Sequence, residues 1–207
     1  MSTPRSRTSL VIAIVLAIVA VAAIAAVAVS RGGSDDDAVT YGVVAVEGQD
    51  LPPGETADAG VGELVPTITG TDYSEQAVTI TPGNGPMMIV VMAHWCPHCN
   101  REIPLLVDWA ESGQVPAGLE VVGISTAASP GRGHFPPGAW LDELGWDWPV
   151  LADDEAQSAA AAVGTTGYPY MLFVAADGRV QAHQSGELPI EVVQQLADDA
   201  AATADAT

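Results

Sequence analysis

The sequence has no lysine, and all six of its basic residues are arginines. Three of these arginines lie within the first 31 residues, whereas the 26 acidic residues all follow from Asp35 onward. Proteins that bind nucleic acid neutralise phosphates with clustered basic side chains, so nucleic acid is excluded as a partner. The net charge of −20 favours solubility and repulsion from anionic lipid head groups. It reflects either the composition of the source or the attraction of a basic partner.

Cysteine is scarce as well: the chain has two, Cys96 and Cys99, which flank Pro97 and His98. Two cysteines exclude a scaffold held by several disulfides. A structural zinc site takes four ligands, typically with a second Cys or His pair at short spacing, and the chain has no such pair. A bridge across two residues closes too small a ring to remove much entropy from the unfolded chain. The pair therefore indicates thiol-disulfide redox chemistry.

The cysteine pair is predicted to lie where a buried strand meets a helix. Residues 87–92 form a continuous apolar run, which is typical of a strand covered on both faces. Pro97 suits the first turn of a helix, because its missing N–H would have no partner there. We therefore expect a helix over residues 97–111, kinked at Pro104, with Cys96 at its N-cap.

The two sulfurs are expected to differ in reactivity. At a helix N-terminus the helix dipole favours a thiolate at Cys96, and a protonated His98 adds positive charge beside it. Cys96 is therefore the predicted nucleophile. Cys99 lies one turn further on and is the predicted resolving cysteine, because it begins an apolar stripe that faces the core and continues with Ile103, Leu106 and Ala110.

A long apolar run occupies the N-terminal part of the chain. Residues 10–29 contain no polar side chain, and a helix of this length spans about 30 Å, the thickness of a bilayer's hydrocarbon core. Arg5 and Arg7 precede the run, so the positive-inside rule places residues 1–9 in the cytoplasm and the dithiol outside it. The run is either a transmembrane anchor or a long signal cleaved near residues 26–28. We expect a single-pass protein of the cell membrane.

Two further segments follow the apolar run. Residues 30–60 are rich in Gly, Asp, Ala and Pro and predict a flexible extracytoplasmic linker, within which residues 41–46 could pair as an edge strand. Residues 61–203 have the length of one compact domain. Its expected strands are 65–69, 77–80, 87–92, 119–124, 148–151, 170–174 and 180–184, and its later helices are 138–144, 154–163 and 189–202. This order predicts an α/β domain with a mixed central sheet and helices on both faces.

Several separated segments resemble the membrane-anchored TlpA/ResA-like thiol-disulfide oxidoreductases of the thioredoxin superfamily. Residues 93–104 contain the WCxxC motif of that family, followed by an acidic residue, an apolar residue and proline. The other matching segments, in the family's order, are 121–125, 148–153, 163–169 and 176–180. The resemblance implies a thioredoxin-like fold.

The resemblance also implies roles for three residues outside the cysteine pair. Pro169 would be a cis-proline that lies against the dithiol, and Tyr168 would present its backbone to a substrate strand and tune redox behaviour. Trp95 would pack beside the dithiol. Without the resemblance, Pro169 would be interpreted as a trans proline at the start of an edge strand, and Trp95 as a core aromatic.

Two features depart from this pattern. Thioredoxins carry a buried aspartate on the central strand, whereas residues 88–92 are all apolar here, so proton transfer to and from Cys99 needs water or another group. Glu102 is a candidate, although it also fits a solvated carboxylate on the helix surface. The pair Pro97-His98 is that of the strongly oxidising DsbA family, whereas the overall resemblance favours a reductase.

Together these features predict an extracytoplasmic enzyme that exchanges disulfides with protein substrates. The substrate would react at Cys96, and Cys99 would resolve the mixed disulfide. The substrates would be secreted proteins or the haem-site cysteines of apocytochrome c, and a membrane redox partner would recharge the dithiol. We expect neither a cofactor nor a metal.

The sequence leaves four alternatives to this function. A DsbA-like oxidase would form disulfides in its substrates, as the Pro97-His98 pair favours. A peroxiredoxin would want Thr or Ser three residues before its reactive cysteine, where this chain has Ala93. A copper or zinc delivery module would use the two cysteines with His94 or His134. A passive membrane-anchored interaction domain would need no redox-active cysteine. Outside these alternatives, His134 and His183 are interpreted as surface histidines.

Overall fold

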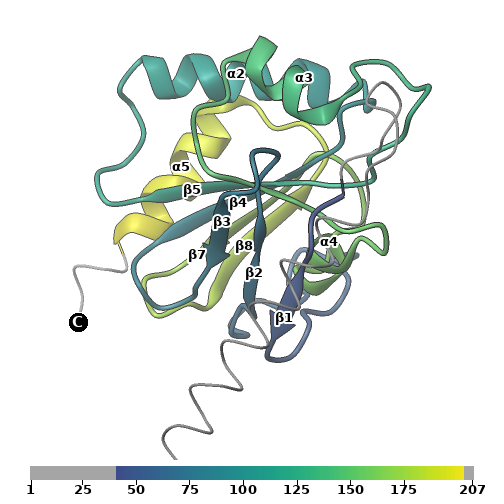
Figure 1. Ribbon diagram of the computed structural model, residues 1–207. Helices are drawn as coiled ribbons and strands as arrows, with labels where there is room; N and C mark the ends of the chain where they lie inside the picture. The colour runs from purple at the N-terminus through teal and green to yellow at the C-terminus, as the bar shows by residue number, and fades with distance from the viewer. Residues whose placement is uncertain (1–40, 203–207) are drawn as a thin grey trace, which may run out of the picture. The chain divides into compact units, whose positions relative to one another are not determined.

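The computed structural model describes residues 41–202, which contain two sheets and four helices (Figure 1). The smaller, antiparallel sheet has the order β1-β2-β3 and consists of Ala45–Glu47, Thr67–Thr71 and Ala77–Ile80. The central sheet has the order β6-β5-β4-β7-β8 and consists of β4 Met87–Met92, β5 Glu120–Ser125, β6 Val150–Ala152, β7 Tyr170–Val174 and β8 Val180–Ser185. The helices are α2 Cys99–Glu111, α3 Pro137–Leu144, α4 Ser158–Ala162 and α5 Ile190–Ala202.

The central sheet is mixed, as predicted. β4 pairs in parallel with β5, and β5 in parallel with β6, whereas β7 is antiparallel to both β4 and β8. β4 is the middle strand, and all six of its residues are buried, which is why its sequence is apolar throughout. The dithiol follows β4 directly. It therefore lies at the carboxyl end of the parallel strands, where loops and helix N-termini meet.

Alternate residues of β4 point to opposite faces of the sheet and enter two hydrophobic clusters. Met88 and Val90 pack in one cluster with side chains of α2, α3 and α5. Ile89 and Val91 pack in the other with side chains of β2, β3 and α4. Helices therefore cover both faces, as the sequence predicts, and the smaller sheet completes the second layer (Figure 1).

Most predicted elements are present, with ends displaced by one or two residues. The helix after the dithiol begins at Cys99, two residues later than predicted, and its N-cap is His98. The carbonyl of His98 accepts the N–H groups of both Arg101 and Glu102, three and four residues further on. Cys96 therefore lies in the turn before the helix and is not its N-cap. Its carbonyl still accepts the N–H of Asn100 at 3.1 Å.

The helix predicted over residues 154–163 is shorter and is confined to α4. Two carboxylates before it accept backbone N–H groups: Asp154 from Ser158 at 2.8 Å and Asp153 from Ala159 at 2.9 Å. These acidic residues therefore cap the helix from outside its N-terminus, where they satisfy otherwise unpaired donors, and do not occupy its first turn.

Residues 41–60 fold onto the domain, so the flexible linker predicted over residues 30–60 is wrong for this part. β1 pairs with β2 at the sheet edge, and Leu51 is buried with its N–H bonded to the last residue of α4. A Cβ at Gly54 would lie 2.5 Å from the hydroxyl oxygen of Tyr170. This glycine permits a close approach of the backbone, which composition alone does not distinguish from flexibility.

The predicted cytoplasmic residues 1–9, the apolar run 10–29 and residues 30–40 lie outside the described residues. Among residues 41–202, no helix combines the length and the apolar character that crossing a membrane requires. The predicted anchor therefore stays a prediction.

Candidate active site

The two cysteines are free thiols at the junction between β4 and α2. Cys96 is 6% exposed and Cys99 is fully buried. Burial raises the pKa of Cys99, and the neighbouring Cys96 sulfur raises it further, because a buried thiolate lacks the solvation that it has in water. Both cysteines are therefore buried, Cys96 slightly less than Cys99, and their roles as nucleophile and resolving cysteine stay predictions.

The loop before β7 brings the predicted proline to the dithiol. The Tyr168-Pro169 peptide bond is cis, as the resemblance implies. The Cys96 thiol donates a hydrogen bond to the carbonyl oxygen of Tyr168 at 3.5 Å. Because β7 is antiparallel to β4, the start of β7 meets the end of β4, and this pairing places Tyr168 beside the reactive sulfur.

Trp95 packs beside the dithiol, as expected. Its ring meets the ring of Tyr168 edge to face at a centroid distance of 6.1 Å, and its indole N–H donates to the carbonyl of Ala127 at 2.7 Å. The guanidinium of Arg132 lies 3.5 Å from the centroid of the Trp95 ring, which is a cation–π contact. Arg132 belongs to a loop rich in Gly and Pro, and its sequence neighbourhood contains no signal for this contact.

His94 holds that same loop against the junction. Its Nδ1 donates to the carbonyl of Gly133 at 2.8 Å, and its Nε2 accepts the N–H of Ser129 at 3.1 Å. Burial lowers the pKa of His94, which favours the neutral ring that this pair of bonds requires. Both nitrogens are therefore occupied. Among residues 41–202, no group of three His, Cys, Asp or Glu side chains could hold a metal ion.

Three side chains, those of His98, Arg101 and Glu187, form a charged cluster at the centre of the Cys96–Cys99 motif. The carboxylate of Glu187 accepts hydrogen bonds from Nδ1 of His98 and from Arg101, whose Nε lies 3.1 Å from Oε1. These two bonds lower the pKa of Glu187 to about 2. Glu187 follows β8 and is 89 residues from His98 along the chain, so no local sequence pattern could have revealed the pair.

Asn100 ties the dithiol turn to α3. Its side-chain N–H₂ donates to the carbonyls of His94 and Cys96, each at 2.9 Å. Its Oδ1 accepts the indole N–H of Trp140 at 2.9 Å. The sequence shows Asn100 only as the residue after the motif, and its position there is the one available signal for this role.

Two carboxylates are buried, one on α2 and one directly after β6. Glu102 is 1% exposed and accepts the N–H of Leu188 at 3.3 Å, so its interpretation as a solvated helix-surface residue is wrong. Burial raises the pKa of Glu102. Asp153 is also buried, and its charge contributes, after burial, to the raised pKa of Tyr168. The strand that precedes the motif carries no acid, but neighbouring elements supply two.

The two remaining histidines differ in their exposure to solvent. His134 is exposed, as predicted, and has a left-handed backbone φ of 62°. His183 is buried, so its predicted surface position is wrong: its ring stacks on Tyr170 at 5.6 Å, across the β7–β8 pair.

Comparisons with known proteins agree with this geometry. A family model described as the AhpC/TSA family matches residues 61–183. Over 147 residues the chain is 26% identical to a protein of Pasteurella multocida (strain Pm70) described as a probable thiol:disulfide interchange protein, DsbE-2, with 70% of this chain and 73% of that protein covered. A second protein of that strain, the thiol:disulfide interchange protein DsbE, is 26% identical over 139 residues, with 66% and 72% covered.

One solved structure extends the comparison. The chain superposes on a thioredoxin-family thiol:disulfide interchange protein from Chlorobium tepidum TLS with a TM-score of 0.53. The match has 17% sequence identity and covers 75% of this chain and 99% of that one. The predicted thioredoxin-like fold is therefore confirmed.

Proposed function

The chain belongs to the AhpC/TSA family and is a thioredoxin-like thiol-disulfide oxidoreductase, and from this premise we propose that it reduces disulfides in proteins outside the cytoplasm. In this proposal residues 10–29 anchor the chain in the membrane with residues 1–9 inside, as the flanking arginines favour. Its substrates are secreted proteins, including apocytochrome c, whose haem-site cysteines would be the reacting groups. A membrane redox partner returns electrons to the dithiol.

The proposed reaction begins at the more accessible sulfur. The Cys96 thiolate attacks one sulfur of a substrate disulfide, a mixed disulfide forms, and the other substrate sulfur leaves as a thiolate and takes up a proton. Cys99 then loses its proton and attacks the Cys96 sulfur, which releases the second substrate thiolate. The dithiol has been oxidised to a Cys96–Cys99 disulfide, and the substrate has gained two electrons. The Tyr168 carbonyl, 3.5 Å from the Cys96 sulfur, is positioned to pair with the substrate backbone.

Cys99 needs a proton acceptor because its burial favours the thiol. Glu102 lies three residues further along α2, on the same side of the helix, and is itself buried with a raised pKa. A carboxylate with a raised pKa is suited to exchange protons near neutral pH. We assign Glu102 this role.

The observation that carries the reducing direction is the contact between Glu187 and His98. Positive charge beside the reactive sulfur stabilises its thiolate and makes the disulfide more oxidising. The carboxylate of Glu187 binds both His98 and Arg101, so its negative charge offsets part of the positive charge that these two side chains bring near Cys96. The Pro97-His98 pair therefore acts in an environment that weakens its oxidising effect.

The test is the reduction potential of the full-length protein in detergent, followed by alkylation of its free thiols in redox buffers. We expect a value nearer to about −270 mV, as in thioredoxin, than to about −120 mV, as in DsbA. Glu187→Gln should raise the potential by about 30 mV, a tenfold change in the equilibrium constant. Glu191→Gln is the matched control, because its exposed carboxylate is on the next helix and makes no contact with His98.

Each outcome is decisive. A wild-type potential near that of DsbA would make the protein a disulfide-forming oxidase. Equal potentials in the wild type and Glu187→Gln would remove the argument from the His98 contact. Absence of a reversible couple between Cys96 and Cys99 would overturn the redox function itself.

A further inference from the structure

Arg132 is the one arginine among residues 41–202 whose guanidinium contacts no carboxylate. Arg101 binds Glu187, and Nε of Arg179 lies 3.7 Å from Asp177. The Arg132 side chain is exposed, and its guanidinium has no hydrogen-bond partner within the described part of the chain. Because the whole chain has a net charge of −20, a cation without an acidic partner is an exception here.

The contact between Arg132 and Trp95 uses only the face of the guanidinium. Its central carbon lies 3.5 Å from the centroid of the Trp95 ring, which is the distance of van der Waals contact between carbon atoms. The N–H donors of a guanidinium lie around its edge, in the plane of the group. The aromatic ring therefore holds the cation without pairing its donors, and these remain available to an anion.

Residues 126–136, which connect β5 to α3 and are called the Arg132 loop here, are fixed on both sides of the arginine. The ring of His94 binds the N–H of Ser129 before it and the carbonyl of Gly133 after it. His134 has a left-handed φ of 62°, which a residue other than glycine keeps only when its surroundings impose it. The loop therefore presents Arg132 at a defined place, which lowers the entropic cost of binding an anion there.

A series of contacts connects Arg132 to the reacting sulfur. Trp95 directly precedes Cys96, and its ring meets the ring of Tyr168 edge to face at 6.1 Å. The carbonyl of Tyr168 in turn lies 3.5 Å from the Cys96 sulfur. A substrate segment paired with the Tyr168 backbone extends by about 3.3 Å per residue, so a side chain within about three residues of the reacting cysteine reaches Arg132.

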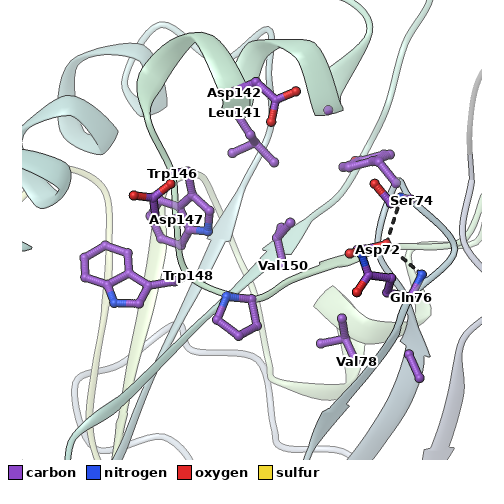
Figure 2. A pocket seen from close by; sticks show the side chains of 14 residues that line it. Asp72, Ser74, Gln76, Val78, Leu141, Asp142, Trp146, Asp147, Trp148 and Val150 are labelled. Atoms are coloured by element: carbon purple, nitrogen blue, oxygen red, sulfur yellow. Dashed lines mark hydrogen bonds between the residues drawn. The ribbon is translucent and has the colours of Figure 1, made fainter.

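The rest of the described surface offers a substrate carboxylate no comparable partner. His98 and Arg101 share the carboxylate of Glu187, so part of their charge is already compensated. Figure 2 shows a pocket lined by three aspartates, Asp72, Asp142 and Asp147. None of the residues that line this pocket belongs to the dithiol motif or to the Arg132 loop. Such acidic surfaces repel a carboxylate, whereas Arg132 attracts it.

We propose that Arg132 selects substrates that carry an aspartate or glutamate within about three residues of the reacting cysteine. A guanidinium binds a carboxylate through two parallel N–H groups, which an uncharged side chain cannot replace. The negative charge of the whole chain opposes a substrate that is acidic throughout, so the selection is for a single carboxylate beside the cysteine. The inference rests on the proposed reduction of protein disulfides and names a class of substrate for it.

The test compares two short peptides, each with a central cysteine and linked as a disulfide dimer. One peptide carries glutamate at both ends, and the other carries glutamine, which has nearly the same shape without the charge. The full-length protein in a nonionic detergent is reduced first and then mixed with excess peptide, and oxidation of its dithiol is followed by alkylation of the remaining thiols. The measured quantity is the ratio of the second-order rate constants for the glutamate and glutamine peptides.

In the wild type this ratio should be about five, because an ion pair at an exposed site contributes a factor of this order. In Arg132→Gln the ratio should fall to about one, even if a changed Trp95 contact slows both peptides alike. Arg179→Gln is the matched control and should keep the wild-type ratio, because it removes the same charge at the start of β8, at the end of the sheet away from the dithiol.

Equal rate constants for the two peptides in the wild type would overturn the inference. So would an unchanged ratio in Arg132→Gln, or an equal loss of the ratio in Arg179→Gln, because the last result would assign the preference to net charge. Failure of the reduced wild type to reduce either peptide would overturn the proposed function itself. That result is distinct from reduction of both peptides at one rate, which would overturn only the role of Arg132.

Discussion

Replacement of Asn100 by alanine should weaken the domain at its active site. The Asn100 side chain makes three hydrogen bonds: it donates to the carbonyls of His94 and Cys96 and accepts the indole N–H of Trp140. Trp140 is only 2% exposed, so water cannot replace Asn100 as its acceptor without rearrangement. The substitution therefore breaks two bonds near the dithiol and leaves a third donor buried without a partner.

The magnitude follows from these three bonds. Loss of the two donated bonds costs about 0.5–1.5 kcal/mol each, and the unpaired indole N–H of Trp140 costs about 1–3 kcal/mol. Alanine has the higher helix propensity and returns roughly 0.5 kcal/mol. We expect Asn100→Ala to lower the free energy of unfolding by about 3 kcal/mol, a large share of the stability of a domain of this size.

The assay is urea unfolding of the full-length reduced protein, followed by tryptophan fluorescence, with the midpoint and slope fitted separately. Trp140→Phe completes a double-mutant cycle with Asn100→Ala, because it removes the indole N–H while keeping a large aromatic side chain. In that background the cost of Asn100→Ala should fall by about 1–2 kcal/mol. A cost below about 1 kcal/mol, or strict additivity of the two substitutions, would refute the reasoning.

Three further predictions concern the titrating groups of the site. Because the pKa of Glu102 is raised in the folded protein, its carboxylate lowers stability above that pKa. In urea titrations Glu102→Gln should therefore increase the free energy of unfolding by about 1 kcal/mol at pH 7.5 and change it little at pH 3.5, and an equal increase at both pH values would contradict this. Because the pKa of His94 is lowered in the folded protein, its stabilising contribution is present above about pH 6.5 and is lost as the pH falls through the folded pKa. In ¹⁵N spectra at pH 6.5 the ring should be neutral and protonated at Nδ1, and a mixture of tautomers would contradict this prediction. Cys99→Ser should accumulate a mixed disulfide between Cys96 and a substrate protein on non-reducing gels, whereas Cys96→Ser should form none.

The parts of the fold that could be predicted from the sequence are those set by local physical chemistry. The strands at 77–80, 87–92 and 170–174 have the predicted bounds. The runs at 87–92 and 170–174 are apolar and fully buried, the strand at 77–80 alternates exposed and buried residues, and the Asp-Gly turn after residue 174 fixes the following hairpin. The cysteine pair and Pro169 were identified from a motif and a family resemblance, and the fold brings them together.

The parts that could not be predicted depend on contacts between distant residues. Glu187 reaches His98 because β8 ends beside the start of α2, and neither segment carries a sign of the other. Leu51 lies in a stretch whose composition resembles a linker, yet one buried leucine and its bond to α4 hold that stretch on the domain. Asp153 directly precedes the helix predicted over residues 154–163, but its burial depends on how the sheet and α4 pack.

The absence of lysine gives the domain an unusual response to trypsin, which cleaves only after lysine or arginine. Residues 41–202 offer it three sites, and each arginine is held by a distant part of the fold: Arg101 by Glu187, Arg132 by the Trp95 ring and Arg179 by the carbonyl of Gly62. Cleavage at each site therefore reports the opening of one known contact. A cut after Arg132 would report the release of the loop over Trp95.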